Sequence, residues 1–477
     1  MTELCDDSAL DLRRRIGVKD ISPVELTESC IRRIESVNGT LNAMVSTCFE
    51  RAMGEAKAAE QAVMDGEFLG ALHGLPIAIK DLEATEGLRT TFGSKIYEDN
   101  VPDEDQLSVA NVRDEGAIVL GKSNTPEFGA GANTRNPVFG ATGNPFDPVK
   151  TCAGSSGGSA VALATGMVPI ASGSDFGGSL RTPASFCGVV GFRPTPGVVP
   201  AENKPAGLLP FSVLGPMGRS VADAALLLSA QASVDARDPY SGDLDPALFD
   251  PMREADLGSM HVAISADLGC APLSKANRAL FKSRTDSFRG VFAEAQDRDP
   301  DFTDVHECFE VLRGVVFVGA HGERVKNHRD IISPYVVDNV DRGLEYSMED
   351  VAKAHLTQTK IARNWISLLN EVDCVICPAA AVTPFPHAEW YVSEIDGTEM
   401  PTYMRWLALS YAPTMAMACG CVLPCGVDEF GMPFGIQVLG APGRDRQVLE
   451  IAAALEHVLA ANAETTRPVP DLAKLAG

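Results

Sequence analysis

The chain has 477 residues, 45% of them apolar and 22% charged, and this composition excludes an intrinsically disordered protein. The length allows up to three domains, but we expect one or two because α/β enzymes often form one large body. The formal net charge is −24, and such an acidic surface would repel a phosphate backbone. We therefore expect no nucleic-acid partner.

The first half of the chain alternates helix and strand signals, as in an α/β sheet protein. Ser22, Pro23 and Glu25 form a capping box with proline at the first helical position, and Gly39 ends this helix. The elements predicted next are a helix over about 45–65, a strand over 74–80, a helix over 105–115 and a strand over 117–120.

The second half gives weaker signals. Ser220 caps a predicted helix over 221–230, and the Asp- and Pro-rich stretch 235–258 is typical of a loop or boundary. Residues 300–410 show little regular pattern. The other predicted elements are a strand over 261–265, a helix over 274–292, a strand over 372–378 and a final helix after Asp445.

The twelve cysteines could form disulfides, but the first residues lack the apolar stretch of a signal peptide. We therefore expect a cytoplasmic protein with free thiols. Cys374 and Cys377 form a CxxC pair in an apolar run, where thiols behave as small buried hydrophobes. Because Cys419, Cys421 and Cys425 also lack His or acidic neighbours, we expect no metal site.

The longest charge-free stretch runs from Thr151 to Ser174. It is long enough to cross a bilayer, but it is rich in Gly and Ser and contains Pro169, whereas membrane helices are predominantly apolar. We expect this stretch to be buried inside the protein and predict no membrane contact.

Two Gly/Ser turns lie in this region, AGSSGGS at 153–159 and GSDFGGS at 173–179. A phosphate-binding loop would need GxxxxGK[ST] or GxGxxG, and neither pattern is present in these two turns. A hydrolase would instead need a serine beside backbone N–H groups that form an oxyanion hole. The second turn fits this requirement, with Phe176, Gly177 and Gly178 as N–H donors beside the Ser179 hydroxyl.

A serine nucleophile needs a base. None of the eight histidines lies in a motif that resembles a serine hydrolase triad. Lysine is the remaining base type. Lys80 ends an apolar strand beside Asp81, where burial would favour the neutral amine.

These residues belong to five motifs whose order resembles that of the amidase signature hydrolases. The similarity covers about residues 20–230 and returns weakly at 424–440. Ala153 replaces a usual glycine, and Phe176 replaces a frequent Thr and is expected to reshape the acyl pocket. The motifs are GLPIAIKD at 74–81, GAIVLGKSN at 116–124, GATGNPFDP at 140–148, AGSSGGSA at 153–160 and GSDFGGSLRTPASFCGVVGFRPT at 173–195.

The resemblance implies an α/β fold of the amidase signature type, with a large mixed β-sheet core flanked by α-helices. We expect residues 1–245 to form the core that carries the motifs. Residues 246–410 would form a less regular lobe over the site, and residues 411–477 would complete the core with a strand and a helix.

The resemblance also implies a Ser–Ser–Lys triad. Ser179 would be the nucleophile, Ser155, after a cis peptide, would relay the proton, and Lys80 would be the base. Asp175 and Arg181 would support the shape of the turn. Ser156 would have a structural role.

The implied function is hydrolysis of a carboxylic amide C–N bond through an acyl-enzyme, without metal or organic cofactor. The substrate would be a small molecule, and aryl amides, carbamates and esters stay open as substrates, as does a homodimer as the assembly. An alternative is a glutamine-hydrolysing amidotransferase A-type subunit that works with partner subunits.

Overall fold

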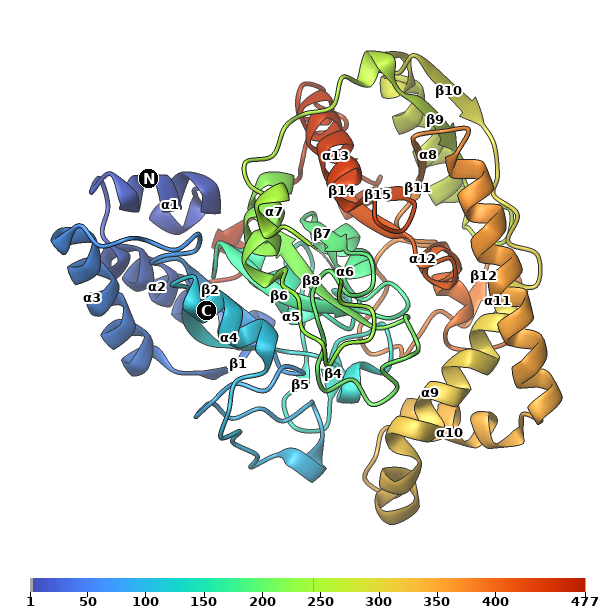
Figure 1. Ribbon diagram of the computed structural model, residues 1–477, viewed down its shortest axis with the longest axis horizontal. Coiled ribbons are helices and arrows are strands. Elements are labelled where there is room, and N and C mark those ends of the chain that lie inside the picture. Colours follow the sequence, from blue (N-terminus) through green and yellow to red (C-terminus); the bar gives the residue numbers. More distant parts are fainter. Residues whose placement is uncertain (1–2, 243, 477) are drawn as a thin grey trace.

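The computed structural model describes residues 3–242 and 244–476, and its centre is one large mixed sheet with helices packed around it (Figure 1). The order of the eleven strands is β1-β3-β2-β6-β8-β7-β14-β15-β11-β9-β10. Their bounds are β1 Met44–Thr47, β2 Pro76–Lys80, β3 Ile118–Ser123, β6 Ile170–Asp175, β7 Val190–Arg193, β8 Val213–Gly218, β9 His261–Ile264, β10 Glu294–Asp297, β11 Cys374–Pro378, β14 Cys419–Val427 and β15 Pro433–Gly440.

The sheet is parallel at the pairs β2–β3, β2–β6, β9–β11 and β9–β10 and antiparallel at its other pairs. Two small hairpins lie apart from it. They are β4 Arg135–Asn136 with β5 Gly140–Ala141, and β12 Glu394–Ile395 with β13 Thr398–Glu399. The predicted α/β class with a large mixed sheet is thus confirmed.

The helices follow the sequence signals closely in the first half of the chain. Ser22 and Glu25 make both hydrogen bonds of the predicted capping box, and Ser220 accepts from the Asp223 N–H at the next predicted cap. The bounds are α1 Ala9–Gly17, α2 Pro23–Leu41, α3 Phe49–Asp65, α4 Leu107–Asp114, α5 Gly157–Ala164, α6 Arg181–Cys187, α7 Val221–Gln231, α8 Lys275–Phe288, α9 Val305–His328, α10 Pro334–Glu345, α11 Met348–Leu369, α12 Ala408–Met415 and α13 Asp445–Ala460.

The prediction of irregular structure over 300–410 is wrong, because α9, α10 and α11 fill most of this stretch. Gly314 and other glycines interrupt the apolar pattern of α9, and glycine normally weakens a helix prediction. Here Gly314 allows close packing: a Cβ at this position would lie 2.9 Å from the Gly343 Cα of α10. In Figure 1 these helices lie at the opposite end of the molecule from α1, α2 and α3.

Three predicted boundaries also need correction. The helix expected to end at Gly39 continues to Leu41 and ends at Asn42, which adopts the left-handed conformation. The helix expected from residue 45 starts at Phe49, because Met44–Thr47 pair with β3. Gly121 permits this pairing, since a Cβ there would collide with the Ser46 carbonyl oxygen. The helix expected over 274–292 ends at Phe288 and is followed by a short 3-10 turn, Arg289–Val291.

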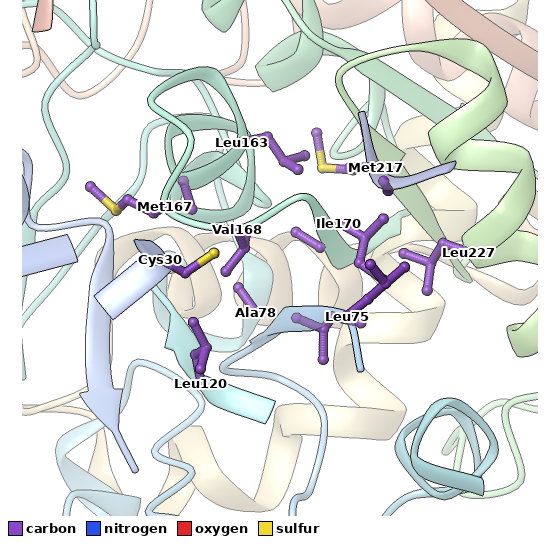
Figure 2. Close-up of a cluster of buried hydrophobic side chains, with 14 of the residues drawn as sticks. Cys30, Leu75, Ala78, Leu120, Leu163, Met167, Val168, Ile170, Met217 and Leu227 are labelled. Atoms are coloured by element: carbon purple, nitrogen blue, oxygen red, sulfur yellow. The ribbon is translucent and has the colours of Figure 1, made fainter. Parts of the chain in front are cut away.

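The charge-free stretch from Thr151 to Ser174 is buried almost throughout, as predicted. Its apolar side chains join a core between the sheet and the N-terminal helices, and Figure 2 shows Leu163, Val168 and Ile170 in one cluster with Leu75 of the segment before β2. This packing holds the strands β2 and β6 side by side. Strand β2 ends at Lys80, and β6 leads into the second Gly/Ser turn.

Among the described residues, no helix has the length and apolar character needed to cross a bilayer. Strands β9, β10 and β11 come from the segment 246–410 and belong to the same sheet as the motif-bearing strands. The domain boundaries given above stay a prediction.

Candidate active site

Lys80 is the last residue of β2, and its side chain is 0% exposed. The Nζ is hydrogen-bonded to three hydroxyls, at 2.7 Å to Ser155, 2.8 Å to Ser156 and 3.0 Å to Ser174. The strand therefore places one amine among serines of both Gly/Ser turns.

The pKa of Lys80 is lowered to about 7, mainly because burial penalises the charged ammonium. The carboxylates of Glu83 and Asp175 oppose this shift by attracting a positive charge. An amine with such a pKa is substantially neutral near pH 7, and only the neutral form can accept a proton.

Ser155 follows a cis peptide bond from Gly154, as the family resemblance implies, and its side chain is buried. The next residue, Ser156, ties the two turns together. Its N–H donates to the Ser179 carbonyl oxygen at 3.2 Å, and its Oγ accepts from the Ser174 N–H at 3.3 Å.

Ser179 is half-buried, and it lines one cavity together with Ser155 and Ser174. Within the described part of the chain, no hydrogen bond joins the hydroxyls of Ser155 and Ser179. The structure thus brings the three predicted catalytic side chains to one region. Lys80 is hydrogen-bonded to Ser155, and Ser179 lines the same cavity as Ser155.

The second turn offers backbone donors beside Ser179. The Gly178 N–H donates to Asp175 Oδ1 at 3.0 Å. In contrast, the N–H groups of Phe176, Gly177 and Ser179 have no acceptor among residues 3–242 and 244–476. The free donors of this turn are therefore not the full predicted set, because Gly178 is occupied and Ser179 adds its own N–H.

Asp175 and Arg181 form a completely buried ion pair rather than a surface contact. Arg181 donates to Asp175 through Nε and Nη2, both at 3.0 Å, and Arg193 adds a third contact at 3.2 Å. Burial acts to raise the pKa of Asp175, but the two guanidinium groups outweigh it and hold this pKa well below its usual value. Since Asp175 also accepts from the N–H groups of Gly178 and Leu180, the pair fixes the shape of the turn.

A second polar network lies behind Lys80, and sequence reasoning missed it. The buried carboxylate of Glu83 accepts from Ser172 at 2.5 Å and from Ser108 at 2.7 Å. The Nζ of Lys122, in the GAIVLGKSN motif, donates to the Glu83 carbonyl oxygen, and burial lowers the pKa of Lys122 to about 8. The Lys80 N–H donates to the same Ser172 hydroxyl at 3.0 Å, so this network supports the end of β2.

The cavity at Ser179 has a volume of about 440 Å³, which is within the usual range for small-molecule sites. Helix α9 and the loop before β8 contribute much of its wall. Its aromatic lining comes from Phe92, Tyr97, Phe128, Phe176 and Phe317. Phe176 is thus part of the pocket wall, as expected from its departure from the family pattern.

The cysteine groups do not form a metal site in the described residues, where no cluster of three or more His, Cys, Asp or Glu side chains could hold an ion. Cys374, Cys377, Cys419, Cys421 and Cys425 are all buried with free thiols.

Comparisons with known proteins agree with this geometry. The family model described as Amidase matches residues 25–449. An acylamidase from Rhodococcus erythropolis is 31% identical over 455 residues, covering 94% of this chain and 95% of that protein. The A-type subunit of the glutamyl-tRNA(Gln) amidotransferase from Synechococcus elongatus is 30% identical, with 94% and 97% covered.

Among solved structures, a bacterial aryl acylamidase of the amidase signature family superposes with a TM-score of 0.87 at 27% identity. The similarity covers 94% of this chain and 96% of that one. Because the family model and the relatives span almost the whole sequence, the chain belongs to the amidase signature family of amide C–N hydrolases.

Proposed function

We propose that this protein hydrolyses the C–N bond of a small-molecule carboxylic amide through an acyl-enzyme on Ser179. Ser155 and Lys80 act as the proton relay. The observation that carries this proposal is the buried Lys80 amine, hydrogen-bonded to Ser155 beside the cavity that Ser179 lines.

The neutral amine suits this role because its contacts are shared among three hydroxyls. Two of its N–H groups are donated to Ser156 and Ser174, which leaves the lone pair for the Ser155 hydroxyl. Ser156 can accept because its own hydroxyl donates to the Ser174 carbonyl oxygen at 3.3 Å. Ser156 is therefore a positioning residue.

In the first half-reaction, Ser179 Oγ attacks the carbonyl carbon while its proton moves to Ser155 Oγ and the Ser155 proton moves to Lys80. The carbonyl oxygen becomes an oxyanion, and the free N–H groups of Phe176, Gly177 and Ser179 are its proposed donors. The C–N bond then breaks as the proton returns through Ser155 to the nitrogen, and the amine leaves. Water hydrolyses the resulting ester by the same relay and releases the acid.

Glutamine hydrolysis within an amidotransferase is the second candidate function, because A-type subunits of such enzymes are among the similar proteins. Free glutamine carries an α-ammonium group that needs an anionic partner. The described residues that line the cavity include no Asp or Glu. We therefore favour an amide without a free ammonium group, and a glutaminase assay on the isolated chain distinguishes the two functions.

The proposal is tested by labelling the purified protein with a fluorophosphonate and by assaying aliphatic amides, anilides, carbamates and glutamine. We expect a label on Ser179 that is absent from Ser179→Ala, and hydrolysis of at least one amide class. The exposed Ser259→Ala is the control and should keep the label. A label that persists in Ser179→Ala would contradict the assignment of the nucleophile.

We also propose that the protein works in the cytoplasm. The twelve thiols are free in the structure, which is compatible with a reducing compartment.

A further inference from the structure

The cavity at Ser179 differs in charge from the rest of the protein. The chain has a formal net charge of −24, yet the cavity wall carries the cations Lys204, Arg313 and Arg324 and, in the described residues, no Asp or Glu. Burial and the two arginines lower the pKa of His321, which also lines the cavity, to about 4. The lining therefore has a net positive charge at neutral pH.

Arg313 is the cation of this lining whose environment is most unusual. It is only 5% exposed, and no carboxylate lies within 4.0 Å of it in the described part of the chain. A buried charge without an opposite charge is costly, and buried arginines are normally paired. Arg181, Arg193 and Arg33 follow this rule. Arg219 instead donates to the backbone carbonyl oxygens of Val168 and Asp7.

The guanidinium of Arg313 is fixed in orientation but not fully satisfied. Nε donates to Asn339 at 2.8 Å, and Nη2 donates to the Tyr403 hydroxyl at 2.9 Å. Nη1 has no acceptor among the described residues. The Arg313 side chain lines both the cavity at Ser179 and a small neighbouring pocket. The Phe317 and Phe176 ring centroids lie 4.3 and 5.1 Å from Cζ. Aromatic rings can cover the faces of a guanidinium, but an anion binds at its N–H edge.

The position of Arg313 connects this free edge to the reacting centre. Phe176 belongs to the turn whose N–H groups are the proposed oxyanion donors, and its ring covers the Arg313 guanidinium. Arg313 also shares one face of α9 with Val316, Phe317 and Arg324, since positions three, four and eleven residues apart lie on the same side of a helix. Ser179, the apolar side chains of this helix face and the two arginines therefore line the same cavity.

We propose that the cavity binds a carboxylate on the substrate through the free edge of Arg313, so that the preferred substrate is an amide that carries a separate carboxylate group. This proposal rests on the proposed amide hydrolysis at Ser179, because Arg313 holds the carboxylate of the substrate while its amide carbonyl reacts with Ser179. Arg324 and Lys204 add positive charge to the same cavity. An amino-acid amide with a free ammonium group is disfavoured, because the lining would repel it.

The test compares matched anilides with the purified full chain. The first pair is glutaric acid monoanilide and hexananilide, which places the carboxylate on the acyl side. The second pair is 4-acetamidobenzoate and 4-methylacetanilide, which places it on the amine side. In at least one pair we expect kcat/KM to be about 10- to 100-fold higher for the charged member, the range typical of one hydrogen bond to a charged group.

Substitution of Arg313 tests whether this residue causes the preference for the charged anilide. In Arg313→Met the ratio of charged to neutral kcat/KM should fall to about one or below, and Arg313→Lys should keep part of it. Arg329→Met is the matched control, because Arg329 is exposed at the end of α9 and already paired with Asp341, and it should keep the wild-type ratio. Equal rates within both pairs in the wild type, or an unchanged ratio in Arg313→Met, would overturn the proposal.

A binding measurement separates this proposal from the proposed function. Calorimetry with Ser179→Ala and each anilide reports recognition without turnover, and thermal melting of each variant shows whether it is folded. Tighter binding of the charged anilide, lost in the double variant with Arg313→Lys or Arg313→Met, supports the carboxylate site even if no anilide is hydrolysed. Hydrolysis of the anilides without any preference in rate or binding would reject the carboxylate site and leave the proposed function standing.

Discussion

The Nζ of Lys80 and the Oγ of Ser155 lie 2.7 Å apart, although 75 positions separate them in the sequence. Burial lowers the pKa of this lysine to about 7, so the pair consists of a hydroxyl and an amine that is largely neutral at physiological pH. Several properties of the protein should depend on this relationship.

The acidic limb of the pH profile should report the protonation of Lys80. Protonated lysine cannot accept a proton, so kcat/KM should fall about tenfold per pH unit below roughly pH 7 and level off above it. Lys80→Met should reduce turnover by about two orders of magnitude or more while the protein stays folded, since general bases typically contribute 10²–10⁴-fold. A rate that stays constant from pH 5 to 8 would contradict the role of Lys80.

Glu83 should influence the pH at which kcat/KM falls on the acidic side of the profile. Its negative charge raises the pKa of Lys80, although burial is the larger influence in the opposite direction. Removal of the charge in Glu83→Gln should therefore lower the pKa of Lys80 and move the acidic limb to lower pH. The exposed Glu104→Gln is the control and should leave the limb in place, as measured by kcat/KM profiles of both variants. An acidic limb that moves to higher pH in Glu83→Gln would show that the predicted direction of the Lys80 pKa shift is wrong.

The sequence singled out Lys80, Ser155 and Ser179 because each lies in a short Gly/Ser turn or at the end of an apolar strand, where local pattern and family motif agree. The structure brings these side chains to one region, and their catalytic roles stay a prediction. The sequence did not predict the polar network of Lys122 and Glu83. The carboxylate of Glu83 accepts hydrogen bonds from Ser108 and Ser172, which are distant in sequence. Arg313 was missed for a related reason.

The glycines of α9 obscured its helical period, so the spacing of Arg313, Phe317 and Arg324 on one helix face could not be recognised. A search for apolar residues three and four positions apart that tolerated glycine would have found this helix. Its orientation toward Ser179, however, follows from its packing against α10, α11 and α12 and not from its own sequence.

The buried pair of Asp175 and Arg181 should matter for stability as well as for the turn. Asp175→Asn would leave the guanidinium groups of Arg181 and Arg193 buried without their carboxylate. Breaking a buried pair typically costs about 3–5 kcal/mol, and urea unfolding should show a loss of this size. Asp338→Asn removes an exposed pair with Arg342 and should cost less than about 1 kcal/mol. Equal midpoints for Asp175→Asn and the wild type would contradict the prediction.

Gly177 and Gly178, in the turn that carries the proposed oxyanion donors, should respond differently to substitution. Gly178 has φ +115°, and a Cβ there would lie 2.5 Å from the Ser410 Cβ, so Gly178→Ala must displace the backbone beside Ser179. At Gly177 the nearest atom to a Cβ would be the flexible Met404 Cε at 3.1 Å. Because a displacement of about 1 Å can reduce the rate about 100-fold, we expect Gly178→Ala to lose at least that much kcat and Gly177→Ala to lose clearly less. Single-turnover acylation rates of both variants, with circular dichroism to verify folding, would measure this difference. If Gly177→Ala proves as inactive as Gly178→Ala, the pocket wall near Met404 is less adaptable than its side chain suggests, and the distinction between the two glycines is wrong.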